Sequence, residues 1–334
     1  MSEESNNRGY CLFGLEALRQ RAPVVAQHSA GVRAAEDIEA VHQMRVATRR
    51  LRAAFALFAD CLPGRDARRW QKDIRRITRA LGAARDTDVQ FEWLKGFLTA
   101  TTDPALLPGI NRLLLRLHQQ RQRQQADVIK ALDRLEADRT IDELNEALRA
   151  AVVQARLEQI EARAPEVYDR AAEAIALRLE EFLAYDVFVH QPERVAELHA
   201  MRIAAKRLRY TLEIFAELYT DELKKPIKAV KEIQELLGGL HDCDVWIDFV
   251  PRFAAEEHAR TFEYFGTDTV MPRLWPGLAA LRADRQRARR QFYRDFVKFW
   301  ERAQTDELWA QLRQAITRPE NRVTHQPPAS SSSA

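Results

Sequence analysis

The sequence predicts an all-α protein. Its apolar residues recur at intervals of three and four rather than two, which is the period of helices that pack on one side. Only 11 glycines occur in 334 residues, and they fall at expected helix ends. A third observation is a duplication. A stretch that begins at His42 returns at His199, so we expect two similar helical bundles.

The duplicated stretch is a helix with one basic side. It reads His42-Gln-Met-Arg-Val-Ala-Thr-Arg-Arg-Leu-Arg52 and returns 157 positions later (199 − 42) as His199-Ala-Met-Arg-Ile-Ala-Ala-Lys-Arg-Leu-Arg209, with seven of eleven residues identical. At about 100° per residue, the cations of each copy fall on one side and the apolar residues on the other. The matching cations are His42, Arg45, Arg49 and Arg52 in the first copy, and His199, Arg202, Lys206 and Arg209 in the second.

In the first half, the pattern predicts helices over about 9–29, 36–61, 65–81, 86–97, 104–137 and 141–164. Pro63-Gly64 should end the second helix, and Gly82 the third. Asp86 is placed to cap the helix that follows. The helix over 141–164 has no matching segment later in the sequence, so we expect it to connect the bundles.

The second half should contain helices over about 165–185, 192–219, 221–237 and 242–255, and a final helix to about residue 302 with a break at Trp275-Pro276. The segment 81–89 matches 237–245 at an offset of 156, and 117–123 matches 281–287 at an offset of 164. We therefore predict a first bundle over 9–164, a second over 165–317, and a disordered tail over 318–334 that is rich in proline and serine.

Charge segregation, rather than charge excess, must create any anion site. The formal charge is only +3, from 52 basic and 49 acidic side chains. Arginine's forked donors suit phosphate oxygens. Each basic row rises about 15 Å along its helix, a length that suits a linear anion better than a single phosphate.

The paired motif resembles the CHAD domain, a histidine-containing all-α domain that binds inorganic polyphosphate. The resemblance covers about residues 9–317 and implies two pseudo-twofold-related bundles of long helices with a central basic groove or pore. It further implies non-enzymatic binding, a cytoplasmic location on polyphosphate granules, and granule proteins as further partners. The expected polyphosphate-binding residues are His42, Arg45, Arg49, Arg50, Arg52, Lys72, Arg75, Arg79, Arg121, Arg123, His199, Arg202, Lys206, Arg207, Arg209, Lys228, Lys231, Arg285 and Arg287.

Two alternatives use the same region. A nucleic-acid binder would use the cations on a sugar-phosphate backbone, but the basic rows carry almost no aromatic residues for stacking bases. A metal-dependent polyphosphate hydrolase or phosphotransferase would need a carboxylate site. The candidates for it are Asp86, Asp88, Asp242 and Asp244, whose simpler role is to cap helices and orient arginines. No phosphate-binding loop or zinc-protease motif occurs, so we expect no catalytic residue, metal or cofactor.

The remaining residue types point to an intracellular location. Cys11, Cys61 and Cys243 lack metal-like spacing and should be reduced core residues. No apolar stretch is long enough to span a membrane, so we expect no membrane contact. We expect His42 and His199 to donate hydrogen bonds to phosphate oxygens, with tighter binding as the pH falls.

Overall fold

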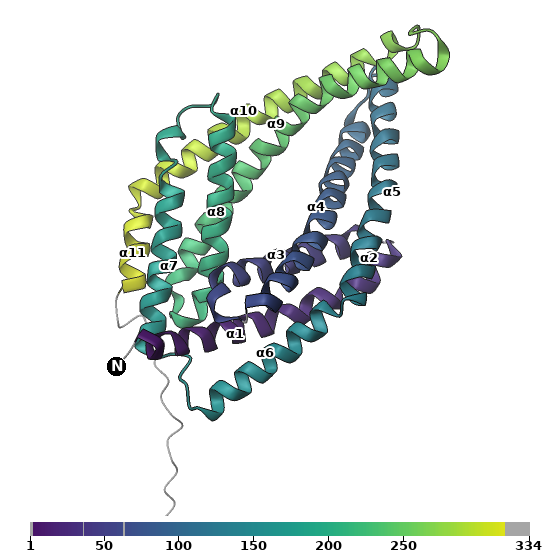
Figure 1. Ribbon diagram of the computed structural model, residues 1–334. Helices are drawn as coiled ribbons and strands as arrows, with labels where there is room; N and C mark the ends of the chain where they lie inside the picture. The colour runs from purple at the N-terminus through teal and green to yellow at the C-terminus, as the bar shows by residue number, and fades with distance from the viewer. Residues whose placement is uncertain (1–2, 36, 63, 318–334) are drawn as a thin grey trace, which may run out of the picture.

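The computed structural model describes residues 3–35, 37–62 and 64–317, and the predicted tail lies outside them. Within these residues the structure is helical and contains no β-strand, which confirms the all-α prediction (Figure 1). The helices of the first half are α1 (Glu3–Gln27), α2 (Ser29–Ala34), α3 (Ile38–Leu57), α4 (Gly64–Ala100), α5 (Leu107–Ala137) and α6 (Thr140–Leu157). Those of the second half are α7 (Pro165–Leu183), α8 (Val195–Phe215), α9 (Lys224–Phe265), α10 (Trp275–Thr305) and α11 (Leu308–Thr317). Five short 3-10 turns join them: η1 (Ala59–Cys61), η2 (Asp186–Phe188), η3 (Ala216–Leu218), η4 (Asp221–Leu223) and η5 (Met271–Arg273).

Two of the predicted helix breaks are wrong. The helices α4 and α9 run without interruption through Gly82 and Gly238. Close packing requires glycine at the neighbouring Gly239, where a Cβ atom would lie 2.5 Å from the ring of Phe292 on α10. The predicted break at Trp275-Pro276 is correct, because α9 ends at residue 265 and α10 begins at residue 275.

Five helices of the second half repeat the packing of five helices in the first. In the first half, α1 packs on α3, α3 on α4, α4 on α5 and α1 on α6. In the same order, α7 packs on α8, α8 on α9, α9 on α10 and α7 on α11. The expectation that the helix after residue 140 lacks a counterpart is therefore wrong, since α11 corresponds to α6. The main contacts between the halves join equivalent helices, namely α1 with α7, α3 with α8 and α5 with α10, as a pseudo-twofold axis requires.

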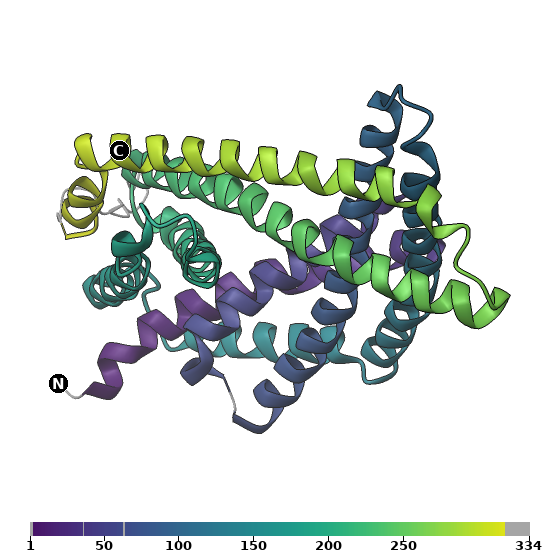
Figure 2. The ribbon, with the colours of Figure 1, turned by 90° about the horizontal axis from the view of Figure 1, so that it is seen from above.

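A reciprocal backbone contact marks this axis at the far end of the molecule. A Cβ atom at Gly109 would lie 2.2 Å from the carbonyl oxygen of Leu274, and one at Gly277 would lie 2.1 Å from that of Leu106. Only glycine allows α5 and α10 to cross this closely. The hairpins α4–α5 and α9–α10 therefore separate near α3 and α8 and meet again at their far ends (Figures 1 and 2).

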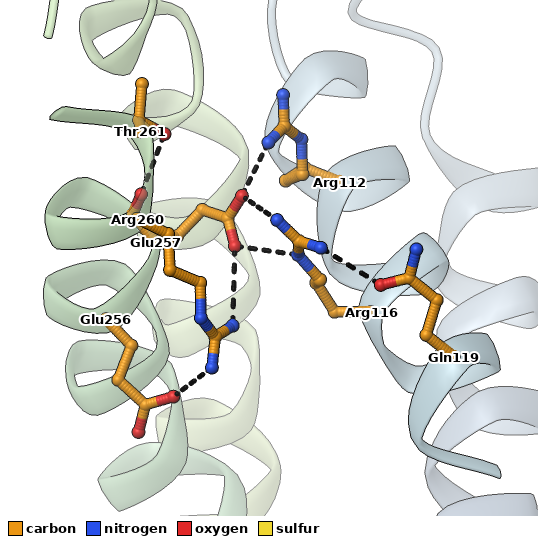
Figure 3. Close-up of polar contacts among 7 residues, drawn as sticks. All are labelled: Arg112, Arg116, Gln119, Glu256, Glu257, Arg260 and Thr261. Carbon is orange, nitrogen blue, oxygen red and sulfur yellow. Dashed lines mark hydrogen bonds and ion pairs between the residues drawn. The ribbon is translucent and has the colours of Figure 1, made fainter. Parts of the chain in front are cut away.

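A buried carboxylate joins the two hairpins near this crossing (Figure 3). Glu257 of α9 is inaccessible to solvent and accepts hydrogen bonds from Arg112 and Arg116 of α5, with both Arg116 contacts at 2.9 Å. Arg260 lies 3.8 Å from the same carboxylate. Burial disfavours the ionised form of Glu257, but the bonds from the two α5 arginines outweigh it and hold its pKa below the ordinary value.

The apolar face of each motif helix lies in the main core, as predicted. On α3, Val41, Met44 and Leu51 are fully buried, and on α8 Met201 and Leu208 are fully buried. Because these faces are fixed against the core, the basic residues on the other side of each helix point away from it.

The prediction of three reduced cysteines is contradicted at two positions. Cys11 and Cys61 form a disulfide that joins α1 to the turn η1, whereas Cys243 is free and buried. The sequence separation of 50 residues gave no sign that their Cα atoms lie 5.1 Å apart. None of the helices in the described residues is both long and apolar enough to cross a membrane.

Candidate anion-binding site

The two basic rows meet in one groove between the halves. His42 and Arg45 of α3 line a cavity of about 320 Å³ together with Arg202 of α8 and His241 of α9. The other lining residues come from α4 and α9: Arg85, Asp86, Val89, Gln90, Asp242, Val245 and Trp246. Four helices, two from each half, therefore contribute to the same cavity.

A second cavity continues the rows by one helical turn. It has a volume of about 310 Å³, and Arg49 and Arg52 of α3 line it together with Lys206 and Arg207 of α8. Arg49 follows Arg45 by four residues on α3, so a cation of the second cavity lies one helical turn from a cation of the first. We refer to both cavities together as the basic groove. Its two ends lie on consecutive turns of the motif helices.

Tyr210 holds the two rows together at this point. Its buried ring lies 5.8 Å from the guanidinium of Arg49 on the opposite helix and 5.0 Å from that of Arg209 on its own helix. Cation–π attraction therefore offsets part of the repulsion between the two arginines. Glu213, which lies 3.5 Å from Arg209, offsets more of it.

Two histidines, His42 and His241, line the groove, and His199 lies beside it; the sequence identified His42 and His199. Burial first, and then nearby arginines, lower the pKa values of His42 and His199. The ring of His241 lies 4.1 Å from that of His199, and burial together with His199 and Arg202 lowers its pKa to about 4. The Nδ1 atoms of His42 and His199 are buried without a hydrogen-bond partner among the described residues. Burial, and after it the surrounding positive charge, therefore favours the neutral form of these rings.

Lys206 is the most strongly perturbed cation of the groove. Burial, followed by repulsion from Arg49 and Arg202, lowers its pKa to about 7. It forms no ion pair with any carboxylate in the described part of the chain. The amine is therefore only partly charged at neutral pH in the free protein.

Two glycines lie beside the arginines of the groove. The position of a Cβ atom at Gly82 lies 3.9 Å from the Nε atom of Arg45, and that at Gly238 lies 3.6 Å from the Nε atom of Arg202. The repeated Leu-Gly pair, which we interpreted as a helix end, is thus a mid-helix position beside a guanidinium, where a Cβ atom would lie at ordinary van der Waals distance.

Asp88 and Asp244, which are equivalent residues of the two halves, each bind an arginine. Asp88 accepts a hydrogen bond of 2.6 Å from Arg121, and Asp244 accepts one from Arg289. Burial raises the pKa values of Asp88 and Asp244, although these arginines oppose the shift. Their predicted orienting role is therefore correct, whereas helix capping is wrong because both helices are continuous.

The matching ion pairs correct the alignment of α5 with α10. Arg121 corresponds to Arg289, and the reciprocal contact relates Gly109 to Gly277, so the offset is 168 rather than the 164 read from the Arg-Gln-Arg repeat. A shift of four residues is about one helical turn and preserves the helix face, which explains why the sequence suggested the wrong partner.

The other cations of the first half divide between the groove and different surfaces. Arg75 and Arg79 of α4 lie close enough to Arg52 to lower its pKa, after the larger effect of burial. Arg50 faces away from the groove, because it lies 3.7 Å from Glu213 and lines a separate cavity between α1, α3 and α8. Arg121 is held by Asp88. The exposed Lys72 and Arg123 line neither cavity of the groove.

The corresponding cations of the second half lie mostly outside the groove. Arg285 and Arg287 are both bonded to Asp284, and Arg285 also stacks 3.7 Å from the ring centre of Trp93. Lys231 is exposed and lies 3.7 Å from Glu235. Lys228 is exposed and lines neither cavity. The structure thus gathers the motif helices in one place and leaves most of the later cations outside it.

The described residues contain no group of three histidines, cysteines or acidic residues arranged to hold a metal ion. Sequence reasoning missed several groove residues because each lies outside the two His-to-Arg rows. The missed residues are Arg85, Arg178, Tyr210 as a bridge, and His241.

Comparisons with known proteins agree with this architecture. A crystal structure of the CHAD domain from the plant Ricinus communis shares 26% identity, with a TM-score of 0.60, over 85% of this chain and 91% of that chain. PptA from Streptomyces chartreusis shares 16% identity, with a TM-score of 0.55, over 88% of this chain and 99% of that chain, and so is similar in fold alone. No curated protein matches the chain. The model of the CHAD domain matches residues 16–251, more than half of the sequence, and the chain therefore belongs to the CHAD domain family.

Proposed function

We propose that the chain binds inorganic polyphosphate, without chemical conversion, in the basic groove. The observation that carries this proposal is that α3 and α8 bring their duplicated cations to the same place. Arg49, Arg52 and Lys206 line one cavity and form no ion pair with a carboxylate of the described residues. Unpaired cations at close range repel one another, so a polyanion that neutralises them stabilises the fold.

The shape of the groove favours a linear anion. Its cations lie on consecutive turns of two helices, so a chain of linked phosphates can contact a new cation at nearly every turn. A single phosphate would leave most of these charges unneutralised. Affinity should therefore rise with the length of the polyphosphate until the groove is filled.

The structure offers little to the two alternatives. A base-stacking surface for a single-stranded nucleic acid requires exposed rings, but Tyr210 is buried between arginines and Trp93 is covered by Arg285. A hydrolytic metal site requires free carboxylates, whereas Asp88 and Asp244 are occupied by arginines. Asp86 lies 3.4 Å from Arg45.

Calorimetric titration with polyphosphate of defined lengths tests the proposal. We expect the logarithm of the affinity to fall linearly with the logarithm of the salt concentration, because each neutralised charge releases a counterion. Polyphosphate should displace bound duplex DNA, and DNA should not displace polyphosphate. No binding at low salt, or preferred binding of DNA, would contradict the proposal. Release of phosphate during incubation with Mg²⁺ or Mn²⁺ would support a hydrolase instead.

Binding should be accompanied by proton uptake. A bound polyanion raises the pKa values of Lys206, His241, His42 and His199 from the lowered values of the free protein. Protons are then taken up at any pH between the pKa of a group in the free protein and its pKa in the complex. Because of Lys206, the affinity should fall as the pH rises above about 7. Because of the histidines, the affinity should increase further as the pH is lowered through their range of titration. Titration in two buffers with different ionisation enthalpies measures the uptake. Equal heats in both buffers would show that these groups do not contact the ligand.

We further propose a cytoplasmic location on polyphosphate granules, with granule proteins as neighbours. Fluorescence microscopy of the tagged chain beside a polyphosphate stain tests the granule association. The Cys11–Cys61 disulfide provides a test of the compartment, since such bonds persist mainly in oxidising surroundings. Thiol labelling of rapidly quenched cells shows whether the pair is bonded in the cell: an intact Cys11–Cys61 bond would contradict a cytoplasmic location, and two reduced cysteines would support it.

A further inference from the structure

Lys206 differs from every other lysine of the chain. The sequence contains nine lysines, and the other eight are exposed side chains on helix surfaces. Lys206 alone is half-buried, in the cavity between α3 and α8. Its counterpart in the first copy of the motif is Arg49, so the second half carries an amine where the first carries a guanidinium. An amine can be acylated when it is neutral, whereas a guanidinium remains charged.

The surroundings of Lys206 combine a nucleophile with an anion site. The cavity is lined by Arg49 and Arg52 of the opposite helix and by Arg207 of its own, and none of the three forms an ion pair with a carboxylate of residues 3–35, 37–62 or 64–317. Arg178 of α7 also lines it but is bonded to Glu181. The cavity of about 310 Å³ can hold a small phosphorylated molecule beside the amine.

We propose that Lys206 is a site of covalent acylation by small acyl phosphates, whose phosphate group is held by the arginines of the same cavity. The Nζ atom forms a bond to the carbonyl carbon of the acyl phosphate, and the bond from that carbon to the phosphate oxygen breaks. The electron pair of the broken bond leaves with the phosphate, which takes up the proton that the amine loses. The products are an amide on Lys206 and hydrogen phosphate.

Two properties of the cavity favour this reaction at neutral pH. The lysine must be neutral to act as a nucleophile, and desolvation beside other cations produces that state. Burial, followed by repulsion from Arg49, Arg202, Arg45 and Arg207, has this effect and lowers the pKa of Lys206 to about 7. Arg52 on α3, Arg178 on α7 and Tyr210 on α8 also line the cavity beside the amine. The arginines that line the cavity stabilise the negative charge that develops on the departing phosphate.

Acylation would remove a cation from the middle of the basic groove. This consequence, unlike the modification itself, rests on the proposed function. If polyphosphate occupies the groove, it should protect Lys206 from the reagent, and an acylated chain should bind polyphosphate more weakly. The acyl phosphate would then act as a covalent antagonist of polyphosphate binding.

The test is incubation of the full chain with acetyl phosphate at pH 7.5, followed by digestion and mass spectrometry of each lysine over time. We expect Lys206 to react at least about tenfold faster than each of the eight exposed lysines, because an amine with an ordinary pKa near 10.4 is only about one-thousandth neutral at this pH. Inorganic phosphate should slow the reaction at Lys206 alone. A rate at Lys206 no greater than those of the exposed lysines would overturn the inference.

Matched reagents and variants separate the two parts of the claim. N-acetoxysuccinimide reacts with neutral amines but carries no phosphate, so the advantage of Lys206 should be smaller with it. An equal advantage with both reagents would overturn the role of the arginines. Arg49→Gln should slow acetylation of Lys206 by acetyl phosphate, whereas Arg50→Gln, which changes an arginine that faces another cavity, should not.

The proposed function and the acylation site fail separately. If acetyl phosphate modifies Lys206 but polyphosphate neither binds in the calorimeter nor protects the amine, the acylation site stands and the proposed function is wrong. If polyphosphate binds tightly but Lys206 reacts like the exposed lysines, the proposed function stands and the acylation site is wrong.

Discussion

Replacement of Arg49 by glutamine should weaken polyphosphate binding by roughly 10- to 150-fold, which corresponds to the loss of about 1.5–3 kcal/mol for a hydrogen bond to a charged group. Arg49 lies where α3 meets α8, and its positive charge acts on Lys206, Arg202 and Arg209 across the groove. Glutamine keeps much of the side chain's length but removes the charge. Calorimetry with long-chain polyphosphate at pH 6.5, where Lys206 is mainly protonated, measures the change.

The adjacent Arg50 supplies the matched control. Arg50 lies on the same helix, and the substitution Arg50→Gln removes the same charge. Its side chain, however, faces the cavity between α1, α3 and α8 and lies 3.7 Å from Glu213. We expect less than about a twofold change, because a single exposed ion pair contributes little. Equal losses in Arg49→Gln and Arg50→Gln would show that the total charge of the helix, rather than the groove, attracts the polymer.

The counterpart of Arg49 across the pseudo-twofold axis tests whether the site is shared by the two halves. We expect Lys206→Gln to lose affinity comparably to Arg49→Gln at pH 6.5. The loss should shrink at pH 8.5, where the Lys206 amine of the free protein is mainly neutral because its pKa is about 7. Loss in only one of the two variants at the lower pH would indicate a site confined to one half.

Replacement of Glu257 by glutamine should lower the free energy of unfolding by about 3–5 kcal/mol, the usual consequence of removing one partner of a buried ion pair. The carboxylate is inaccessible to solvent, and its loss leaves Arg112 and Arg116 of α5 facing Arg260 of α9 without a compensating charge (Figure 3). Urea denaturation followed by circular dichroism measures the change. Hydrogen exchange should locate the loosened region at the far ends of the two hairpins.

A neighbouring residue again supplies the control. Glu256 is exposed and contacts only Arg260 among the described residues, at 3.2 Å, so Glu256→Gln should change the free energy of unfolding by less than about 1 kcal/mol. The pKa of Glu257 is below its ordinary value, so its contribution should be present above the unfolded pKa and disappear as the pH falls through the folded pKa. If Glu257→Gln is as stable as Glu256→Gln, the two hairpins do not depend on this carboxylate for their contact.

Local periodicity was sufficient to predict the helices but not all of their ends. The final helix was predicted to break at Trp275-Pro276, and α10 begins there, because proline fits the first turn of a helix and interrupts a preceding one. Gly82 and Gly238 misled the prediction, since a glycine that ends a helix and one that lies inside a continuous helix beside another helix look the same in a sequence. Which role applies depends on a contact with a residue far away in the chain.

In the candidate site, too, some residues could be predicted from the sequence and others only from tertiary packing. His42, Arg45, Arg202 and Lys206 were found from the duplication alone, because each is a repeated position on a helical face. His241 was missed although it lies in the repeated segment 237–245, because only the packing of α9 on α8 places its ring beside His199. Arg289 was missed for a related reason: a shift of one helical turn gives an equally plausible alignment until Asp244 identifies the correct partner.

The sequence by itself determined the all-α class, the internal duplication and the basic face of each motif helix, because these follow from the spacing of residues along one helix. Only the tertiary structure decided that the two faces share a groove, that Lys206 lies among arginines, and that Arg50 faces elsewhere. The physical reason is that charge repulsion and burial act through space. A lysine's pKa and reactivity depend on which helices pack beside it, and no local pattern records that packing.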